Sequence, residues 1–171
     1  DTLCCLSGVR QRWRLKPQRR RQMSRGRTPR IVAFLAYAGL IPFLALLVAS
    51  WLDTQRSSVW QQLSLQYGAV ILSFVGALHW GFAMSVQFVS DRKRNACFAW
   101  SVIPALLAWL ALALDPLAGS ALLATGFGVH YLQDWRLFRH AGLPKWYLPL
   151  RLQLSVVASA SLLATSLASH V

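Results

Sequence analysis

The chain has 171 residues, of which 56% are hydrophobic and eight are Trp, and its formal net charge is +13. This balance argues against an ordinary soluble domain, and the length limits the chain to one helical bundle. Three cysteines do not make a disulfide framework, and the sequence has no paired carboxylates and none of the common catalytic motifs. We therefore expect no enzymatic activity, no cofactor and no metal site.

Residues 1–30 form a basic N-terminal arm with ten Lys or Arg and one acid. Such a segment resembles an organellar transit peptide, and a retained transit segment is one interpretation. A free arm of this composition would be disordered, so we expect it to be extended and bound to anionic phospholipid or to acidic surfaces of partner subunits. Nucleic acid fits the charge less well, because no nucleic-acid-binding fold accompanies the arm. The expected contacts are Arg19, Arg20 and Arg21.

Five apolar stretches follow the arm, and a helix needs about 20 such residues to cross a bilayer. We expect spans at 31–51, 67–89, 96–114, 117–132 and 152–169. The more polar residues 59–66 are expected to form an interfacial turn before the second span. The fourth span is short, so residues 133–138 would extend it to the head groups. The predicted fold is all-α: a polytopic bundle of about five transmembrane helices, with the arm in front.

Basic residues gather on one side of these spans. Seventeen of the eighteen Lys and Arg lie in the arm and in every second connection, and only Arg56 lies on the other side. This is the positive-inside pattern, and the basic side would face an anionic lipid surface. For a mitochondrial inner membrane, it predicts the N-terminus in the matrix and the C-terminus in the intermembrane space. The expected lipid or partner contacts in the connections are Arg92, Lys93, Arg94 and Lys145.

His79 is an ionisable side chain inside the second span, near its middle, where such residues often mark a function. It would serve as a haem or chlorophyll ligand, a proton relay or a quinone contact, or it is a neutral imidazole bonded to a neighbouring helix, which we favour. His130 stands at a similar depth in the fourth span. The geometry would allow His79 and His130 to share one ligand, but a match in depth alone is better explained as coincidence.

Packing signals surround His79. A stripe of small residues recurs every four positions in the second span and predicts a close helix contact, with His79 on nearly the opposite side. Pro42 and Pro104 predict kinks in the first and third spans. The stripe consists of Ala69, Ser73, Ala77, Gly81 and Ser85.

The charged residues near the membrane give little support to transport. Asp134, just past the fourth span, is expected to pair with Arg136 as an interfacial clamp. No acid inside a span is available to couple an ion, and the five spans show no inverted repeat.

Four segments carry a resemblance to a known family: YAGLIPF (37–43), YGAVILSFVGALHWG (67–81), WSVIPALLAWLAL (100–112) and GLPKWYLPLRLQLS (142–155). In this order they resemble the small family named for transmembrane protein sixty-nine, a domain of unknown function in bacteria and mitochondria. The resemblance covers about residues 31–168 and leaves out His130 and the arm. It implies a helical inner-membrane protein without an established reaction. The matching residues are Gly39, Pro42, Tyr67, Gly68, Ser73, Gly76, His79, Trp80, Gly81, Pro104, Gly142, Leu143, Pro144, Trp146, Tyr147 and Arg151.

Residues 143–149 contain two prolines five positions apart with aromatics between them, which predicts a stiff ribbon in the head-group layer. This ribbon looks like a docking surface, with Trp146 and Tyr147 as contacts. Arg151, at the start of the last span, would reach a phosphate or a partner's carboxylate, or would only anchor the helix by snorkelling.

Together these features predict a non-catalytic accessory subunit of a large mitochondrial inner-membrane assembly, and the assembly that we expect is a respiratory complex or supercomplex. Its neighbours would be other membrane subunits and a cardiolipin-like anionic phospholipid. A photosynthetic supercomplex is the same hypothesis in another membrane. The alternative is a free-standing haem-, quinone- or lipid-binding membrane protein that uses His79.

Overall fold

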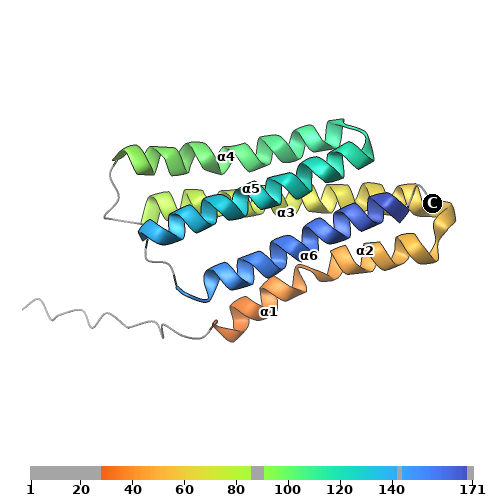
Figure 1. Ribbon diagram of the computed structural model, residues 1–171, viewed down its shortest axis with the longest axis horizontal. Coiled ribbons are helices and arrows are strands. Elements are labelled where there is room, and N and C mark those ends of the chain that lie inside the picture. Colours follow the sequence, from red (N-terminus) through yellow and green to blue (C-terminus); the bar gives the residue numbers. More distant parts are fainter. Residues whose placement is uncertain (1–27, 86–90, 142–143, 169–171) are drawn as a thin grey trace, which may run out of the picture.

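The computed structural model describes residues 28–85, 91–141 and 144–168, and these residues form helices, turns and no strand. The long helices lie side by side in one bundle (Figure 1), so the expected all-α polytopic fold is confirmed. The expected contacts Arg19, Arg20 and Arg21 lie outside the described residues. The elements are α1 (Arg30–Ala38), α2 (Ile41–Leu52), the 3-10 turn η1 (Thr54–Arg56), α3 (Ser57–Ser85), α4 (Asp91–Ala113), α5 (Pro116–Ala141) and α6 (Tyr147–Ala168).

Four helical segments of the described chain are long and apolar enough to cross a membrane: Arg30–Leu52, Thr54–Met84, Arg94–Ala113 and Tyr147–Ala168. The fifth, α5, has 26 residues and is long enough to cross as well, but it is more polar. Large apolar side chains such as Leu52 and Trp109 are exposed on the outer faces of the bundle. Such faces suit contact with lipid tails.

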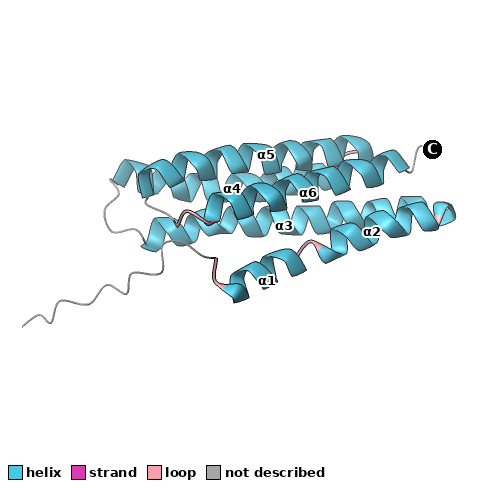
Figure 2. Ribbon diagram, turned by 60° about the horizontal axis from the view of Figure 1, so that its bottom comes forward, coloured by secondary structure: helices cyan, strands magenta, loops and turns pink. Residues whose placement is uncertain are grey.

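The first span is broken rather than merely kinked. α1 ends at Ala38 and α2 begins at Ile41, with Pro42 in its first turn, where a missing N–H is tolerated. The Tyr67 hydroxyl donates a 2.8 Å hydrogen bond to the Gly39 carbonyl at the break. As Figure 2 shows, α1 and α2 lie at an angle to each other along one side of the bundle.

The expected interfacial turn at 59–66 is wrong, because these residues belong to α3. Ser64 and Leu65 are each only 1% exposed, so the first turns of α3 already pack against the bundle. α3 therefore begins about three turns earlier than the hydropathy indicated.

The small-residue stripe expected on α3 is a packing face only at its start, where Ala69 is buried. Ala77 and Gly81 are exposed, and a Cβ added at Gly81 would meet nothing within 4 Å. The helix packs closely at Gly76 instead, where a Cβ would come within 2.9 Å of the Pro104 ring on α4. Because only a residue without a Cβ fits there, Gly76 sets the distance between α3 and α4. The buried face of α3 includes Leu65, Ala69, Leu72, Val75 and His79.

The expected ribbon at 143–149 is also wrong in its second half. Leu143 lies outside the described residues, Lys145 and Trp146 form a turn, and Tyr147 begins α6. Pro149 occupies the first turn of α6, where it is compatible with a helix.

The two ends of the bundle differ in charge as the sequence predicts. α3 and α5 end, and α4 and α6 begin, at the same end of the bundle (Figure 1), and Arg92 and Lys145 beside these helix termini are exposed. At the opposite end, the carboxylates of Asp53 and Asp115 accept hydrogen bonds from the backbone N–H groups of Arg56 and Ala118. These acids therefore cap the starts of helical turns.

Candidate functional site

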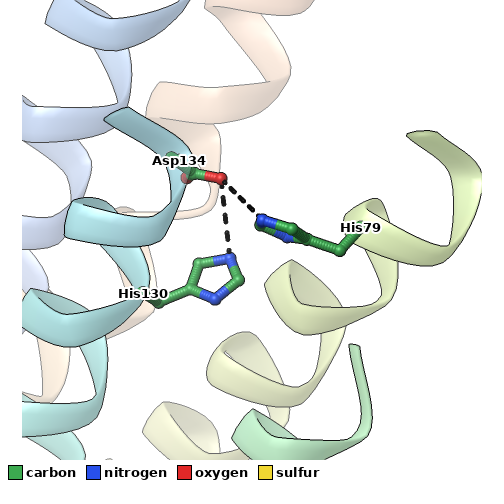
Figure 3. Close-up of side chains that lie close together, drawn as sticks. All are labelled: His79, His130 and Asp134. Atoms are coloured by element: carbon green, nitrogen blue, oxygen red, sulfur yellow. Dashed lines mark ion pairs between the residues drawn. The ribbon is translucent and has the colours of Figure 1, made fainter. Parts of the chain in front are cut away.

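Three helices bring four ionisable side chains together in the interior of the bundle. His79 comes from α3, His130 and Asp134 come from α5, and Arg151 comes from α6. Figure 3 shows the two imidazoles pointing toward the Asp134 carboxylate. All four residues are buried: the exposed fraction is 0% for His79, 1% for His130, 0% for Asp134 and 6% for Arg151. We call these four residues the polar cluster.

An ion pair joins α5 to α6 at the centre of the polar cluster. The Arg151 Nε donates to Asp134 Oδ2 at 2.9 Å. Both expectations for Arg151 are therefore wrong: it neither snorkels nor reaches outward, but turns inward to a carboxylate of its own chain. Asp134 pairs with Arg151 rather than in a clamp with Arg136. A buried charge left without its partner would be costly, so these two residues depend on each other.

The second oxygen of Asp134 faces the two histidines. Asp134 Oδ1 lies 3.5 Å from His79 Nε2 and 3.9 Å from His130 Nε2. The imidazole centroids are 4.7 Å apart, with their planes at 72°. The matched depth that looked like coincidence in the sequence is thus a true contact between α3 and α5.

Trp100 on α4 determines the protonation state of His130. Its indole Nε1 donates to His130 Nδ1 at 3.3 Å, and the two ring planes differ by only 18°. An indole N–H can only donate, so His130 Nδ1 must offer a lone pair. His130 is therefore neutral, with its proton on Nε2, the atom that faces Asp134.

The polar cluster lies nearer the basic end of the bundle than the middle. His79 precedes Ser85, the last residue of α3, by six positions, and Arg151 follows Tyr147, the first residue of α6, by four. At about 1.5 Å per residue, the cluster is one to two turns inside that end. His79 lies in the last third of α3, because α3 begins ten residues before the apolar stretch.

The donor atoms of His79, His130 and Asp134 all lie within 4.8 Å of one another, which is a spacing that a metal ion could use. Two features disfavour that use. A ligating imidazole normally donates from its other nitrogen, whereas His130 Nδ1 accepts from Trp100. The Arg151 guanidinium beside Asp134 would also repel a cation.

An apolar pocket of about 470 Å³ adjoins the polar cluster. It lies beneath the break between α1 and α2, and its walls come from α1, α2, α3, α5 and α6. Its volume falls in the range of small-molecule sites, about 300–1,000 Å³. The lining includes Leu35, Ala36, Leu40, Phe43, Phe74, Phe127, Trp146, Tyr147, Arg151 and Leu154.

Tyr147 and Arg151 belong to both the pocket wall and the surroundings of the polar cluster. The Tyr147 hydroxyl is buried beside Asp134 and Arg151 and contacts both side chains, but it has no hydrogen bond of good geometry with either. Several other buried polar atoms in this region also have no hydrogen-bond partner among the described residues. They are Arg151 Nη2, His130 Nε2, Asp134 Oδ1 and both ring nitrogens of His79. Such atoms are rare in protein interiors unless a ligand or water meets them.

The remaining expected contact residues divide between the basic end and the pocket. Arg92 and Lys145 are exposed, and Arg94 pairs with Asp91 at 3.3 Å. Trp146 lines the pocket. The side chain of Lys93 lies outside the described residues.

Sequence reasoning identified His79 and Arg151 but missed the roles of Asp134 and Trp100. A usable signal was present, because His130 and Asp134 are four positions apart and share one face of a helix. Asp134 is also an acid within a helix rather than at its start. The pairing itself depends on how α6 packs, which no local pattern contains.

The fold and the site define a class: a polytopic helical membrane protein with a buried polar cluster beside an apolar pocket. Within that class, the chain belongs to the family described as a protein of unknown function, DUF3429, which matches residues 28–167. This match confirms the resemblance seen in the sequence.

Two curated relatives carry the name Transmembrane protein 69. The one from Xenopus tropicalis is 35% identical over 153 residues, and the match covers 84% of this chain and 56% of the relative. The one from Mus musculus is 26% identical over 145 residues, with 84% and 58% covered. The chain thus spans little more than half the length of these relatives. No solved structure matches it.

Proposed function

We propose that the protein binds a lipid-like small molecule within the membrane, with the hydrocarbon part in the apolar pocket and the polar head beside the polar cluster. One observation carries this proposal. The pocket wall is apolar except where Tyr147 and Arg151 join it to the cluster, and both residues hold a buried polar atom without a hydrogen bond of good geometry. Convergent polar groups at one end of an apolar cavity are typical of ligand sites.

The break in the first span gives this site a way into the membrane. α1 contacts the rest of the described bundle mainly through α6, where the Tyr37 hydroxyl donates to Gln153 Oε1 at 2.7 Å. Val32, Leu35 and Ala36 of α1 form one wall of the pocket. A hydrocarbon chain could therefore enter from the bilayer by displacing a short helix rather than by opening the core.

Native mass spectrometry of the detergent-purified protein tests the proposal. We expect a discrete small-molecule adduct on the 19.1 kDa chain, lost in Ala36→Trp, which fills the pocket. Ala99→Trp, the same change on an exposed face of α4, is the matched control and should keep the adduct. A broad mixture of membrane lipids bound equally to all three proteins would contradict the proposal.

We also propose that the protein is an accessory subunit of a mitochondrial inner-membrane assembly, with its basic end in the matrix. The exposed Arg92 and Lys145 at one end of the bundle support this second role. A mild-detergent native gel tests it: co-migration with a respiratory complex is the expected result, and migration as the free chain or a small oligomer would contradict it. The two roles are compatible, because a bound lipid can stabilise a subunit.

A further inference from the structure

We infer that the head group of the ligand is electrically neutral and presents carbonyl or hydroxyl oxygens, as the heads of quinones and acylglycerols do. This inference rests on the proposed function and specifies the chemistry of the same site. It follows from the charges and hydrogen-bonding atoms of the polar cluster, taken in turn.

The charges of the polar cluster already balance. The Arg151 guanidinium is paired with Asp134 at 2.9 Å, and the hydrogen bond from Trp100 shows His130 to be neutral. His79 is fully buried, and Arg151 already balances the charge of the Asp134 carboxylate beside it, so the neutral imidazole is its stable form. A phosphate or carboxylate head would place a second anion beside Asp134, with one guanidinium shared between them. A cationic head would face Arg151. Both arrangements bury an uncompensated charge, which a neutral head avoids.

The hydrogen-bonding atoms beside the pocket would be satisfied by an oxygen atom of the ligand. Arg151 lines the pocket, and its Nη2 atom, which can only donate, is buried without a hydrogen-bond partner. The Tyr147 hydroxyl beside it can donate or accept. A carbonyl oxygen would accept from both, and a hydroxyl could accept from Arg151 and donate to Tyr147.

The histidines and Asp134 form a second layer behind these two residues. His130 Nε2–H is a donor, Asp134 Oδ1 is an acceptor, and neutral His79 offers one of each. A layer with both kinds of group can adjust when a carbonyl head is exchanged for a hydroxyl head. The Val75 carbonyl on α3 is a hydrogen-bonding neighbour of His130, so it faces the histidine rather than the ligand.

Tyr147→Phe is a discriminating variant because the lost hydroxyl has no hydrogen bond of good geometry in the protein itself and makes only weak polar contacts with Asp134 and Arg151. The variant should therefore fold normally. Tyr131→Phe, on α5 and outside the pocket lining, is the matched control. The probes are a benzoquinone with a ten-carbon tail, dioctanoylglycerol, cardiolipin and Zn²⁺, and the readout is the thermal unfolding midpoint of the detergent-purified protein across a titration of each probe.

We expect at least one neutral probe to stabilise the wild-type protein saturably and to bind about tenfold more weakly to Tyr147→Phe, the effect of one lost hydrogen bond. Tyr131→Phe should bind like the wild type. Comparing the quinone with the glyceride shows whether the natural ligand has a quinone head or an acylglycerol head.

Three results would overturn the inference. One is preferential binding of cardiolipin that Ala36→Trp abolishes, which would keep the pocket but make its head group anionic. Another is saturable stabilisation by Zn²⁺ that His79→Gln abolishes, which would make the cluster a metal site. The third is the absence of saturable binding by either neutral probe. Equal binding of a neutral probe to the wild type and Ala36→Trp would instead reject the proposed function itself.

Discussion

Asp134 is the residue on which the polar cluster depends, because its two oxygens face different helices. One oxygen holds Arg151 of α6 at 2.9 Å, and the other faces His79 of α3 at 3.5 Å. Its side chain is fully buried. A carboxylate in this position persists only because the guanidinium compensates its charge.

Asp134→Asn should lower the free energy of unfolding by about 3–5 kcal/mol, because it leaves the Arg151 cation buried without its anion. Asp91→Asn is the matched control: Asp91 pairs with Arg94 at 3.3 Å, but its side chain is 90% exposed, so the loss should stay under about 1 kcal/mol. Unfolding by titration with a denaturing detergent measures both. Equal losses would show that the Asp134 pair is no more important than a surface pair.

At the scale of helices, the sequence predicted well what depends on local composition. Apolar runs marked the spans containing α1 and α2, α4 and α6, because hydropathy is a property of each run. The prediction from sequence failed where packing between helices overrides composition. Ser64 is polar but buried in α3, and Gly81 belongs to a small-residue stripe yet is exposed. Small residues permit a close approach, but the neighbouring helix decides which of them is used.

The contact of Gly76 with Pro104 yields a prediction for α3 and α4. Gly76→Ala should destabilise the protein by about 1–3 kcal/mol relative to Gly81→Ala, since its new Cβ would lie 2.9 Å from the Pro104 ring. Both variants gain the same helix propensity, so their difference isolates the packing. The same unfolding titration measures it, and an equal or greater stability of Gly76→Ala would show that α4 is free to move away.

The polar cluster shows why a site is harder to predict than a span. The sequence shows that the two histidines lie at a similar depth, because α3 and α5 run in the same direction. Whether their side chains face each other depends on how each helix is rotated about its axis. Arg136 is closer to Asp134 in sequence than Arg151 is, yet Arg151 is its partner because α6 packs beside α5. Long-range pairing of this kind is specified by the assembled bundle.

At the scale of the whole molecule, charge separates the two ends of the bundle. The basic side chains Arg92 and Lys145 are exposed at one end, whereas the acids Asp53 and Asp115 cap helical turns at the other. The polar cluster lies toward the basic end, so a ligand head held there would be nearer to that end of the bundle than to the other.

The proposed orientation predicts a labelling pattern in mitoplasts that carry the protein without its native cysteines, Cys4, Cys5 and Cys97. A membrane-impermeant maleimide should label Gln55→Cys directly and Lys145→Cys only after the membrane is permeabilised. Both positions are exposed in the structure, so access depends on the side of the membrane. The opposite pattern would reverse the orientation.

The central claim, a lipid-like ligand whose head lies beside Tyr147 and Arg151, is tested most directly by an experimental structure of the protein purified in mild detergent. We predict continuous density in the pocket, running from Leu35 and Phe43 to the Arg151 guanidinium, with an oxygen of the ligand within hydrogen-bonding distance of Arg151 Nη2. Side chains that close the pocket around a fully hydrogen-bonded polar cluster would contradict the claim and leave the cluster with a purely structural role.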